Sequence, residues 1–131
     1  MPYFYDNSVG NSEATMTLSS LNDWTQKGIG RLVIWYIGDA ANAAEQMYVT
    51  LNGSAVVYND NLDVSLIDQW TSWNINLQEF TDQGIDLTDV DTLGIGFGDR
   101  DNPQPGGSGL VFFDDIRLYP PLPESEPEPV P

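Results

Sequence analysis

A carboxylate in an otherwise apolar strand is the first sign of chemistry in this sequence. Residues 110–119 read Leu-Val-Phe-Phe-Asp-Asp-Ile-Arg-Leu-Tyr, and alternation places Asp114 on the same face as Phe112, Ile116 and Leu118. A carboxylate buried among apolar side chains is costly unless it is paired or binds a metal ion. The chain has no His and no Cys, so a metal ion here would be held by oxygen atoms, as Ca²⁺ prefers.

Aromatic side chains near amides indicate a second kind of site, one that binds sugars. Sugar rings stack on exposed aromatic rings, while nearby amides and carboxylates bond their hydroxyl groups. Trp35 is opposite in phase to its apolar neighbours and should face outward, unless a loop buries it. Tyr48 should face outward beside Gly94 and Gly96, which would leave a trough, unless its ring is merely exposed without a role. The predicted ligand-binding residues are Trp35, Tyr48, Asn74, Asn76, Asp99 and Arg100.

Short alternating segments, separated by turn residues, must position these side chains. The dipeptide Asn52-Gly53 between two such segments is typical of a two-residue β-hairpin. Trp24 and Trp70 lie at loop junctions, where we expect them to close the core rather than to bind a ligand. The predicted strands are residues 2–7, 13–18, 31–37, 47–51, 55–58, 70–77, 92–98 and 110–119.

This pattern predicts an all-β fold of about eight strands, a sandwich or a barrel, and of these we expect a two-sheet antiparallel β-sandwich. In a jelly-roll topology, strands one, eight, three and six form one sheet, and strands two, seven, four and five form the other. Residues 1–119 would make up this module. Residues 120–131 contain six Pro and three Glu, which predicts an extended linker to neighbouring domains of the same parent chain.

The strong acidity of the chain limits its partners. There are 20 Asp and Glu against 4 Lys and Arg, which gives a net charge of −16. Nucleic acids and anionic lipids both need clustered cations, so we expect neither a nucleic-acid nor a membrane partner. For the same reason, a bound polysaccharide should be neutral or weakly charged.

The sequence does not predict catalysis. Paired carboxylates can hydrolyse glycosides, but no pair stands out among so many acidic residues. A Ser–His nucleophile is excluded because the chain has no His. The spaced glycines of residues 94–98 follow the phase of a strand and open no helix, unlike a nucleotide-binding motif. We therefore expect a protein that is not an enzyme.

Three motifs carry a family resemblance that spans residues 2–120. They are Tyr-Asp-Asn-(x5)-Glu-Ala at residues 5–14, Asp-Trp-Thr at residues 23–25, and Gly-Phe-Gly-Asp … Gly-Gly-Ser-Gly-x-x-x-Phe-Asp-Asp-Ile-Arg-Leu-Tyr at residues 96–119. Together they resemble the carbohydrate-binding-module-like jelly-roll domains of large secreted proteins from planctomycetes and related marine bacteria. More broadly, the chain is similar to the galactose-binding-like β-sandwich superfamily.

The resemblance implies a structural Ca²⁺ near the first and last strands. Its ligands would be Asp6, Glu13 and Asp114, with Asp115 replacing Asp114 if the strand phase differs by one residue. In the alternative without a metal, backbone N–H groups or Arg31 satisfy Asp114.

The resemblance also implies a function. It suggests a non-catalytic, monomeric carbohydrate-binding module of a secreted, extracellular bacterial protein, which binds a polysaccharide through exposed aromatic and polar residues. The alternative is a structural or adhesive spacer domain that has no sugar site.

Overall fold

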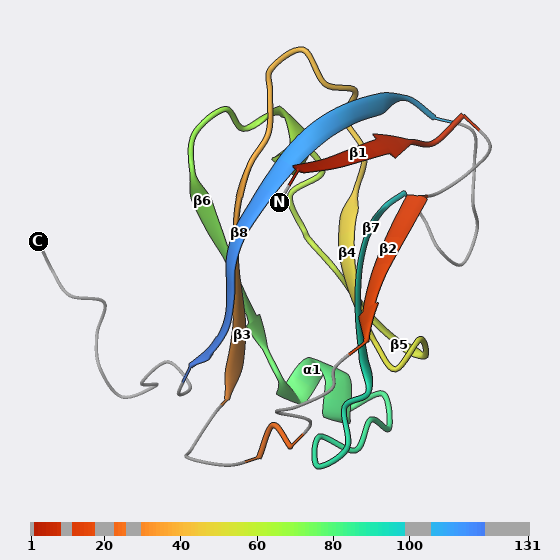
Figure 1. The fold of residues 1–131 in the computed structure, drawn as a ribbon, viewed down its shortest axis with the longest axis vertical. Coiled ribbons are helices and arrows are strands. Elements are labelled where there is room, and N and C mark those ends of the chain that lie inside the picture. The colour runs from red at the N-terminus through yellow and green to blue at the C-terminus, as the bar shows by residue number, and fades with distance from the viewer. Residues whose placement is uncertain (1, 9–11, 18–22, 26–29, 99–105, 120–131) are drawn as a thin grey trace, which may run out of the picture.

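The computed structural model describes residues 2–8, 12–17, 23–25, 30–98 and 106–119 of the 131-residue chain. Within these residues the chain forms two four-stranded antiparallel sheets (Figure 1). The strands are β1 (Pro2–Asp6), β2 (Ser12–Thr17), β3 (Arg31–Ile37), β4 (Met47–Leu51), β5 (Ala55–Tyr58), β6 (Thr71–Asn76), β7 (Thr92–Phe97) and β8 (Ser108–Tyr119).

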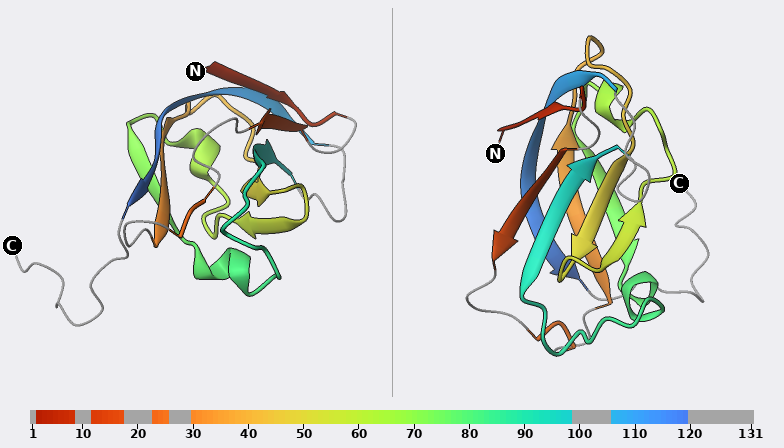
Figure 2. Two further views of the ribbon diagram at one scale, coloured as in Figure 1. Left: turned by 60° about the horizontal axis from the view of Figure 1, so that its bottom comes forward. Right: turned by 90° about the vertical axis from the view of Figure 1, so that its right-hand side faces the viewer.

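The order of the strands is that of a jelly roll. One sheet runs β1-β8-β3-β6 and the other runs β2-β7-β4-β5. The right-hand view of Figure 2 shows the two sheets as separate layers, with β2, β7, β4 and β5 in front. The predicted fold class and both predicted sheet orders are therefore confirmed. No helix in the described part of the chain is long and apolar enough to cross a membrane.

Alternating side chains of facing strands build the core between the sheets. Leu32, Ile34 and Tyr36 of β3 are buried there, as their phase predicts, and Met47 and Val49 of β4 are buried opposite them. These β-branched and aromatic residues favour strands because they pack well on a pleated, half-buried surface. The core therefore fixes which face of each strand is left for solvent.

Aromatic rings join the sheets near one edge of the sandwich. The ring of Phe97 on β7 stacks on Tyr5 of β1, with centroids 4.4 Å apart and planes at 20°. Tyr3 also stacks on Phe97, at 5.8 Å, and contacts Phe113 edge-on, at 6.3 Å. Stacked and edge-to-face pairs of this kind stabilise a core beyond their buried area.

Short turns and loops close the ends of the sandwich. Asn52 and Gly53 have φ values of 54° and 68°, so they form the tight hairpin predicted between β4 and β5. The 3₁₀ helix η2 (Val64–Leu66) follows β5, and the single turn α1 (Gln78–Thr81) follows β6. Phe80 of α1 is fully buried and anchors that end of the core.

A bulge in β8 corrects the predicted phase of this strand. In the pairing of β3 with β8, Val33 lies opposite Arg117, whereas Trp35 lies opposite Asp114. Two residues of β8 thus lie between these pairs where β3 has one, which is the geometry of a β-bulge. Because of the extra residue, the alternation of inward and outward side chains in β8 changes phase at this point.

The consequence is that Asp114 faces outward. Val111 and Phe113 are buried before the bulge, and Ile116 and Leu118 pack against the core after it. Asp114 itself is exposed. The prediction of an inward carboxylate among apolar neighbours is therefore wrong, because strict alternation does not hold across the bulge.

Candidate functional site

Trp35 lies on the outer face of the β1-β8-β3-β6 sheet, on the central strand β3 and two residues before its end. Its chain neighbours Ile34 and Tyr36 are in the core, so alternation turns the indole ring outward, and 38% of the residue is exposed. Its cross-strand partners are Ser72 on β6 and Asp114 on β8. The prediction that Trp35 faces outward is confirmed, and the alternative of burial beneath a loop is wrong.

Two more aromatic residues are exposed at this end of the sheet. Phe112 on β8 is 43% exposed and is paired with Ile37 of β3. Trp70 is 50% exposed and immediately precedes β6, so continuing the β3–β6 register places it beside Ile37. We call Trp35, Trp70 and Phe112 the outer aromatic face.

The role expected for Trp70 was wrong. The structure buries Trp24, as predicted, but leaves Trp70 exposed. A signal for this was present, because Trp70 has the same period-two phase as Asn74 and Asn76, both predicted ligand-binding residues.

Polar side chains continue this face along the strands. Asn74 is exposed on β6, and its Oδ1 atom accepts a hydrogen bond of 2.5 Å from the Arg31 guanidinium. The same guanidinium lies over the ring of Tyr119, 5.1 Å from its centroid. The hydrogen bond from Arg31 therefore holds the Asn74 side chain in place rather than leaving it loosely solvated. Val33 is only 4% exposed although it lies outside the core cluster, so its neighbours on this face cover it.

Asn76 has a different partner. It is exposed on β6, in register with Arg31, as its phase predicts. Its Oδ1 atom accepts a hydrogen bond of 2.9 Å from the backbone N–H of Gln78, the first residue of α1. Asn76 thus satisfies an N–H group at the start of a helix, as side chains near helix N-termini commonly do.

The arrangement as a whole suits non-covalent binding. Apolar rings at one end of the outer face adjoin a carboxylate, a hydroxyl and an amide, from Asp114, Ser72 and Asn74. Residues two apart on a strand are separated by about 7 Å, so these groups line an elongated surface along β3. Such a surface offers ring stacking and hydrogen bonds to a ligand that has both flat apolar faces and hydroxyl groups.

Tyr48, predicted to be a second platform, is fully buried. Its ring occupies the space that Gly96 leaves open, because a Cβ atom at Gly96 would overlap the Tyr48 ring. The Tyr48 hydroxyl donates a 2.9 Å hydrogen bond to Glu13 Oε1, and the Tyr58 ring lies 5.6 Å away. The prediction of an exposed ring beside an open trough is therefore wrong, because the tyrosine fills the trough itself.

The three carboxylates predicted to bind calcium lie in different surroundings. Asp6 Oδ1 accepts the Ser8 N–H at 3.0 Å, and its hydrogen bonds with Ser8 lower the pKa of Asp6. Glu13 accepts the hydroxyl of Tyr48, and Asp114 faces outward beside Trp35. Among the residues that the structure describes, no three acidic side chains form a group that could hold a metal ion. These residues do not fit the predicted calcium site, and calcium binding itself stays a prediction.

Three predicted residues lie wholly or partly outside the described part of the chain. Asp99 and Arg100 fall between residues 98 and 106, and their roles as ligand-binding residues stay predictions. The backbone of Asp115 belongs to β8, but its side chain is outside the described residues. The predicted linker, residues 120–131, is outside them as well.

Two amide side chains connect the terminal strands to the rest of the sandwich. Asn7, which is fully buried, donates to Glu45 Oε1 at 2.8 Å and to the Phe97 carbonyl at 3.0 Å. Asn42 donates to the carbonyl of Leu110 at 2.9 Å and accepts its N–H at 3.0 Å. Sequence reasoning missed this structural role of both residues, because an Asn in a loop also fits an ordinary turn.

Solved structures that resemble this fold include two of carbohydrate-binding modules. One is the family 11 carbohydrate-binding module of the cellulosomal cellulase Lic26A-Cel5E of Clostridium thermocellum, with 13% identity and a TM-score of 0.49, covering 96% of this chain and 90% of that one. The other is the family 11 module from Clostridium thermocellum in complex with a β-1,3-1,4-mixed-linked tetrasaccharide, with 13% identity and a TM-score of 0.53, covering 93% and 89%.

No family model and no curated protein matches the sequence. The resemblance to modules of planctomycete proteins and to the galactose-binding-like superfamily stays a prediction. The likeness to the tetrasaccharide-bound structure shows the fold alone, namely the jelly-roll β-sandwich of a family 11 carbohydrate-binding module.

Proposed function

We propose that this chain is a non-catalytic module that binds a polysaccharide on its outer aromatic face. The observation that carries the proposal is the exposure of Trp35, Trp70 and Phe112 at one end of one sheet face. Grouped apolar exposure rimmed by polar groups is typical of binding surfaces, because isolated folded domains rarely leave such patches in water.

The chemistry of the polar neighbours favours a sugar over a purely apolar ligand. Asp114 and Ser72 flank Trp35 across the two adjacent strands, and Asn74 is the next outward residue on β6. A carboxylate, a hydroxyl and an amide can accept or donate hydrogen bonds to the hydroxyl groups of a sugar stacked on the indole. The solved structure of similar fold that contains a mixed-linked tetrasaccharide supports the same ligand class.

The charge of the chain sets the expected kind of polysaccharide. A net charge of −16 repels heavily sulfated or uronic chains over a distance of about 8 Å in physiological salt. We therefore expect a neutral or weakly charged ligand. The proposal includes an extracellular location, since polysaccharides are polymers of cell surfaces and matrices. It also includes a monomeric state and neighbouring domains in the same parent chain.

Affinity electrophoresis of the module tests the proposal. The gels should contain, one at a time, mixed-linked β-1,3-1,4-glucan, xylan, an algal galactan and a heavily sulfated chain. We expect retardation by at least one neutral polysaccharide, which Trp35→Ala and Trp70→Ala each weaken strongly. Leu62→Ala is the matched control, because Leu62 is an exposed apolar residue, at 59%, outside the strands of this sheet.

Two results would count against the proposal. If no polysaccharide in the panel retards the wild-type protein, with or without Ca²⁺, the alternative of a structural or adhesive spacer domain is favoured. If retardation survives both Trp substitutions, the ligand binds elsewhere on the module.

A further inference from the structure

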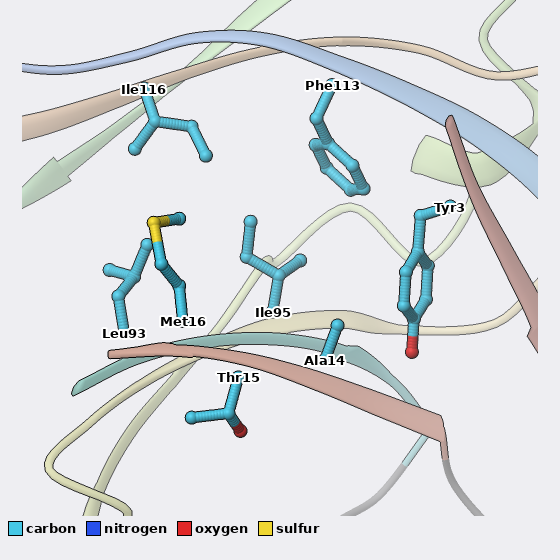
Figure 3. A pocket seen from close by; sticks show the side chains of 8 residues that line it. All are labelled: Tyr3, Ala14, Thr15, Met16, Leu93, Ile95, Phe113 and Ile116. Atoms are coloured by element: carbon cyan, nitrogen blue, oxygen red, sulfur yellow. The ribbon is translucent and has the colours of Figure 1, made fainter. Parts of the chain in front are cut away.

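An apolar cleft between the two sheets lies apart from the outer aromatic face. It is lined by side chains of β1, β2, β7 and β8 (Figure 3). Its volume is about 280 Å³. The cleft arises from unequal strand pairing. In the described residues β1 pairs with β8 only as far as Phe112, whereas β2 pairs with β7 as far as Thr17. C-terminal to Phe112, β8 lies opposite β2 at the edge of the sandwich. The described part of β1 does not cover this edge, so it is open to solvent.

The lining of the cleft is almost entirely apolar. Figure 3 shows Phe113 and Ile116 extending from β8 toward Ile95 of β7 and Met16 of β2, while the Thr15 side chain points away. Met16 is 44% exposed and forms part of the rim. The lining residues are Tyr3, Ala14, Thr15, Met16, Leu93, Ile95, Phe113 and Ile116.

The Tyr3 hydroxyl is the polar group at one end of this lining. The hydroxyl keeps its proton at neutral pH, as an ordinary tyrosine does, and burial together with the negative charge of Glu13 raises the pKa of Tyr3 further. It can therefore donate or accept one hydrogen bond at the ring-lined end of the cleft. Glu13 nearby makes this end unfavourable for an anion.

We propose that this cleft binds a small uncharged aromatic molecule of one or two rings that carries one hydrogen-bonding group, such as phenol or indole. An apolar cavity of about 150 Å³ in another protein binds benzene, so the volume here suffices for one or two rings. The aromatic rings of Tyr3 and Phe113 and the thioether of Met16 line the cleft, and such groups make favourable contacts with an aromatic ring. A sugar is a poor occupant, because most of its hydroxyl groups would lose their hydrogen bonds to water.

A strand from another protein does not suit this edge. Asp114 is exposed on β8 next to the cleft, and the bulge follows directly. Edge charges and bulges are devices that keep further strands from pairing. The geometry therefore favours a free small molecule over an added polypeptide segment.

Methyl-resolved NMR titration of the whole chain tests the proposal, with phenol, indole and benzoate as probes. We expect phenol and indole to produce saturable shifts in the methyl signals of Met16, Ile95 and Ile116. The indole N–H signals of Trp35 and Trp70 should stay unchanged, and benzoate should bind at least tenfold more weakly. Shifts that do not saturate, that occur at the two tryptophans instead, or that are equal for benzoate would overturn the proposal.

A matched pair of variants localises the binding. Ala14→Phe places a ring within the cleft, whereas Thr15→Phe adds the same bulk on the neighbouring residue that points away. We expect Ala14→Phe to abolish phenol binding and Thr15→Phe to keep it. Equal binding by both folded variants would refute the site. If Ala14→Phe does not fold, Ala14→Val narrows the cleft more gently and should weaken phenol binding at least threefold; unchanged binding in Ala14→Val would refute the site too.

Discussion

Trp35 on β3 and Asp114 on β8 are direct cross-strand partners on an exposed sheet face. The bulge in β8 creates this pair, because strict alternation would have turned Asp114 into the core. A carboxylate beside an exposed indole gives a stacked sugar both an apolar platform and a strong hydrogen-bond acceptor. The residue that first suggested a buried metal ligand thus lies on the face of the proposed polysaccharide site.

Replacing Asp114 should therefore affect binding and not folding. We expect Asp114→Ala to weaken polysaccharide binding by about tenfold, since hydrogen bonds to a charged group contribute about 1.5–3 kcal/mol and 1.4 kcal/mol is a factor of ten. The melting temperature should stay within about 2 °C, because the side chain is exposed and the chain already carries excess negative charge. Calorimetric titration and thermal unfolding of the same samples check both statements.

Asn76 supplies a control for this experiment, because it lies on the same sheet face but its side chain accepts a hydrogen bond from the backbone N–H of Gln78. Asn76→Ala should lower stability by about 1 kcal/mol, the contribution of one hydrogen bond, and leave affinity nearly unchanged. A large fall in the melting temperature of Asp114→Ala, with affinity preserved, would instead assign Asp114 a structural role.

Alternation and turn chemistry were sufficient to predict the strands, and the family resemblance favoured the jelly roll. The β3 segment, residues 31–37, has matching predicted and observed bounds, and so do β4 and β5 around Asn52-Gly53. These segments were predictable because their period-two patterns end at residues that favour turns. The order of strands in both sheets followed from the jelly-roll topology and is confirmed.

Whether a strand side chain is buried or exposed was harder to predict where period-two alternation alone does not decide it. Residues 110–119 are apolar on both faces around two adjacent Asp residues, so the sequence carries no mark of the bulge. Tyr48 was assigned correctly to the outer side of β4, but its burial depends on Gly96, a residue of another strand. Bulges and long-range packing are properties of paired strands, and a single-strand pattern does not contain them.

The contact between Gly96 and Tyr48 makes a second prediction. A Cβ atom at position 96 would meet the Tyr48 ring and would lie 2.6 Å from the carbonyl oxygen of Ser12. Because Tyr48 is fully buried, its ring cannot simply move into solvent. Gly96→Ala should therefore destabilise the module by about 1–3 kcal/mol, measured by urea unfolding.

A double-mutant cycle isolates the Gly96–Tyr48 contact. Tyr48→Ala removes the ring, so adding Gly96→Ala to it should cost less than Gly96→Ala costs in the wild-type protein. Strict additivity of the two changes in unfolding free energy would contradict the proposed overlap.

Calcium removal gives a third prediction, which tests the ion separately from its predicted ligands. We propose that a structural Ca²⁺ raises the melting temperature and that EDTA lowers it again. Asp114→Asn should leave this response unchanged, because Asp114 faces outward and shares no acidic cluster with Asp6 and Glu13. Thermal unfolding of metal-free protein with added Ca²⁺ is the measurement, and identical curves with and without EDTA would end the calcium proposal.

Alkaline pH should destabilise the module through its buried tyrosines. Burial raises the pKa of Tyr36 and is the main cause of the raised pKa values of Tyr3 and Tyr5. An acid whose pKa is higher in the folded state holds its proton more tightly there, so the folded state binds more protons than the unfolded state. The stability contributed by these hydroxyls is therefore complete below about pH 10 and is lost as the pH rises through the folded-state pKa values.

Urea unfolding between pH 8 and pH 11, with absorbance titration of the phenolate bands, measures this effect. The chain has six Tyr residues, and we expect those at positions 3, 5 and 36 to ionise late, together with loss of the folded state. Tyr36→Phe removes one of these groups and should reduce the fall in unfolding free energy between pH 10 and pH 11 relative to the wild-type protein. Ionisation of all six tyrosines in one step near pH 10, in a protein that stays folded, would contradict the raised pKa values.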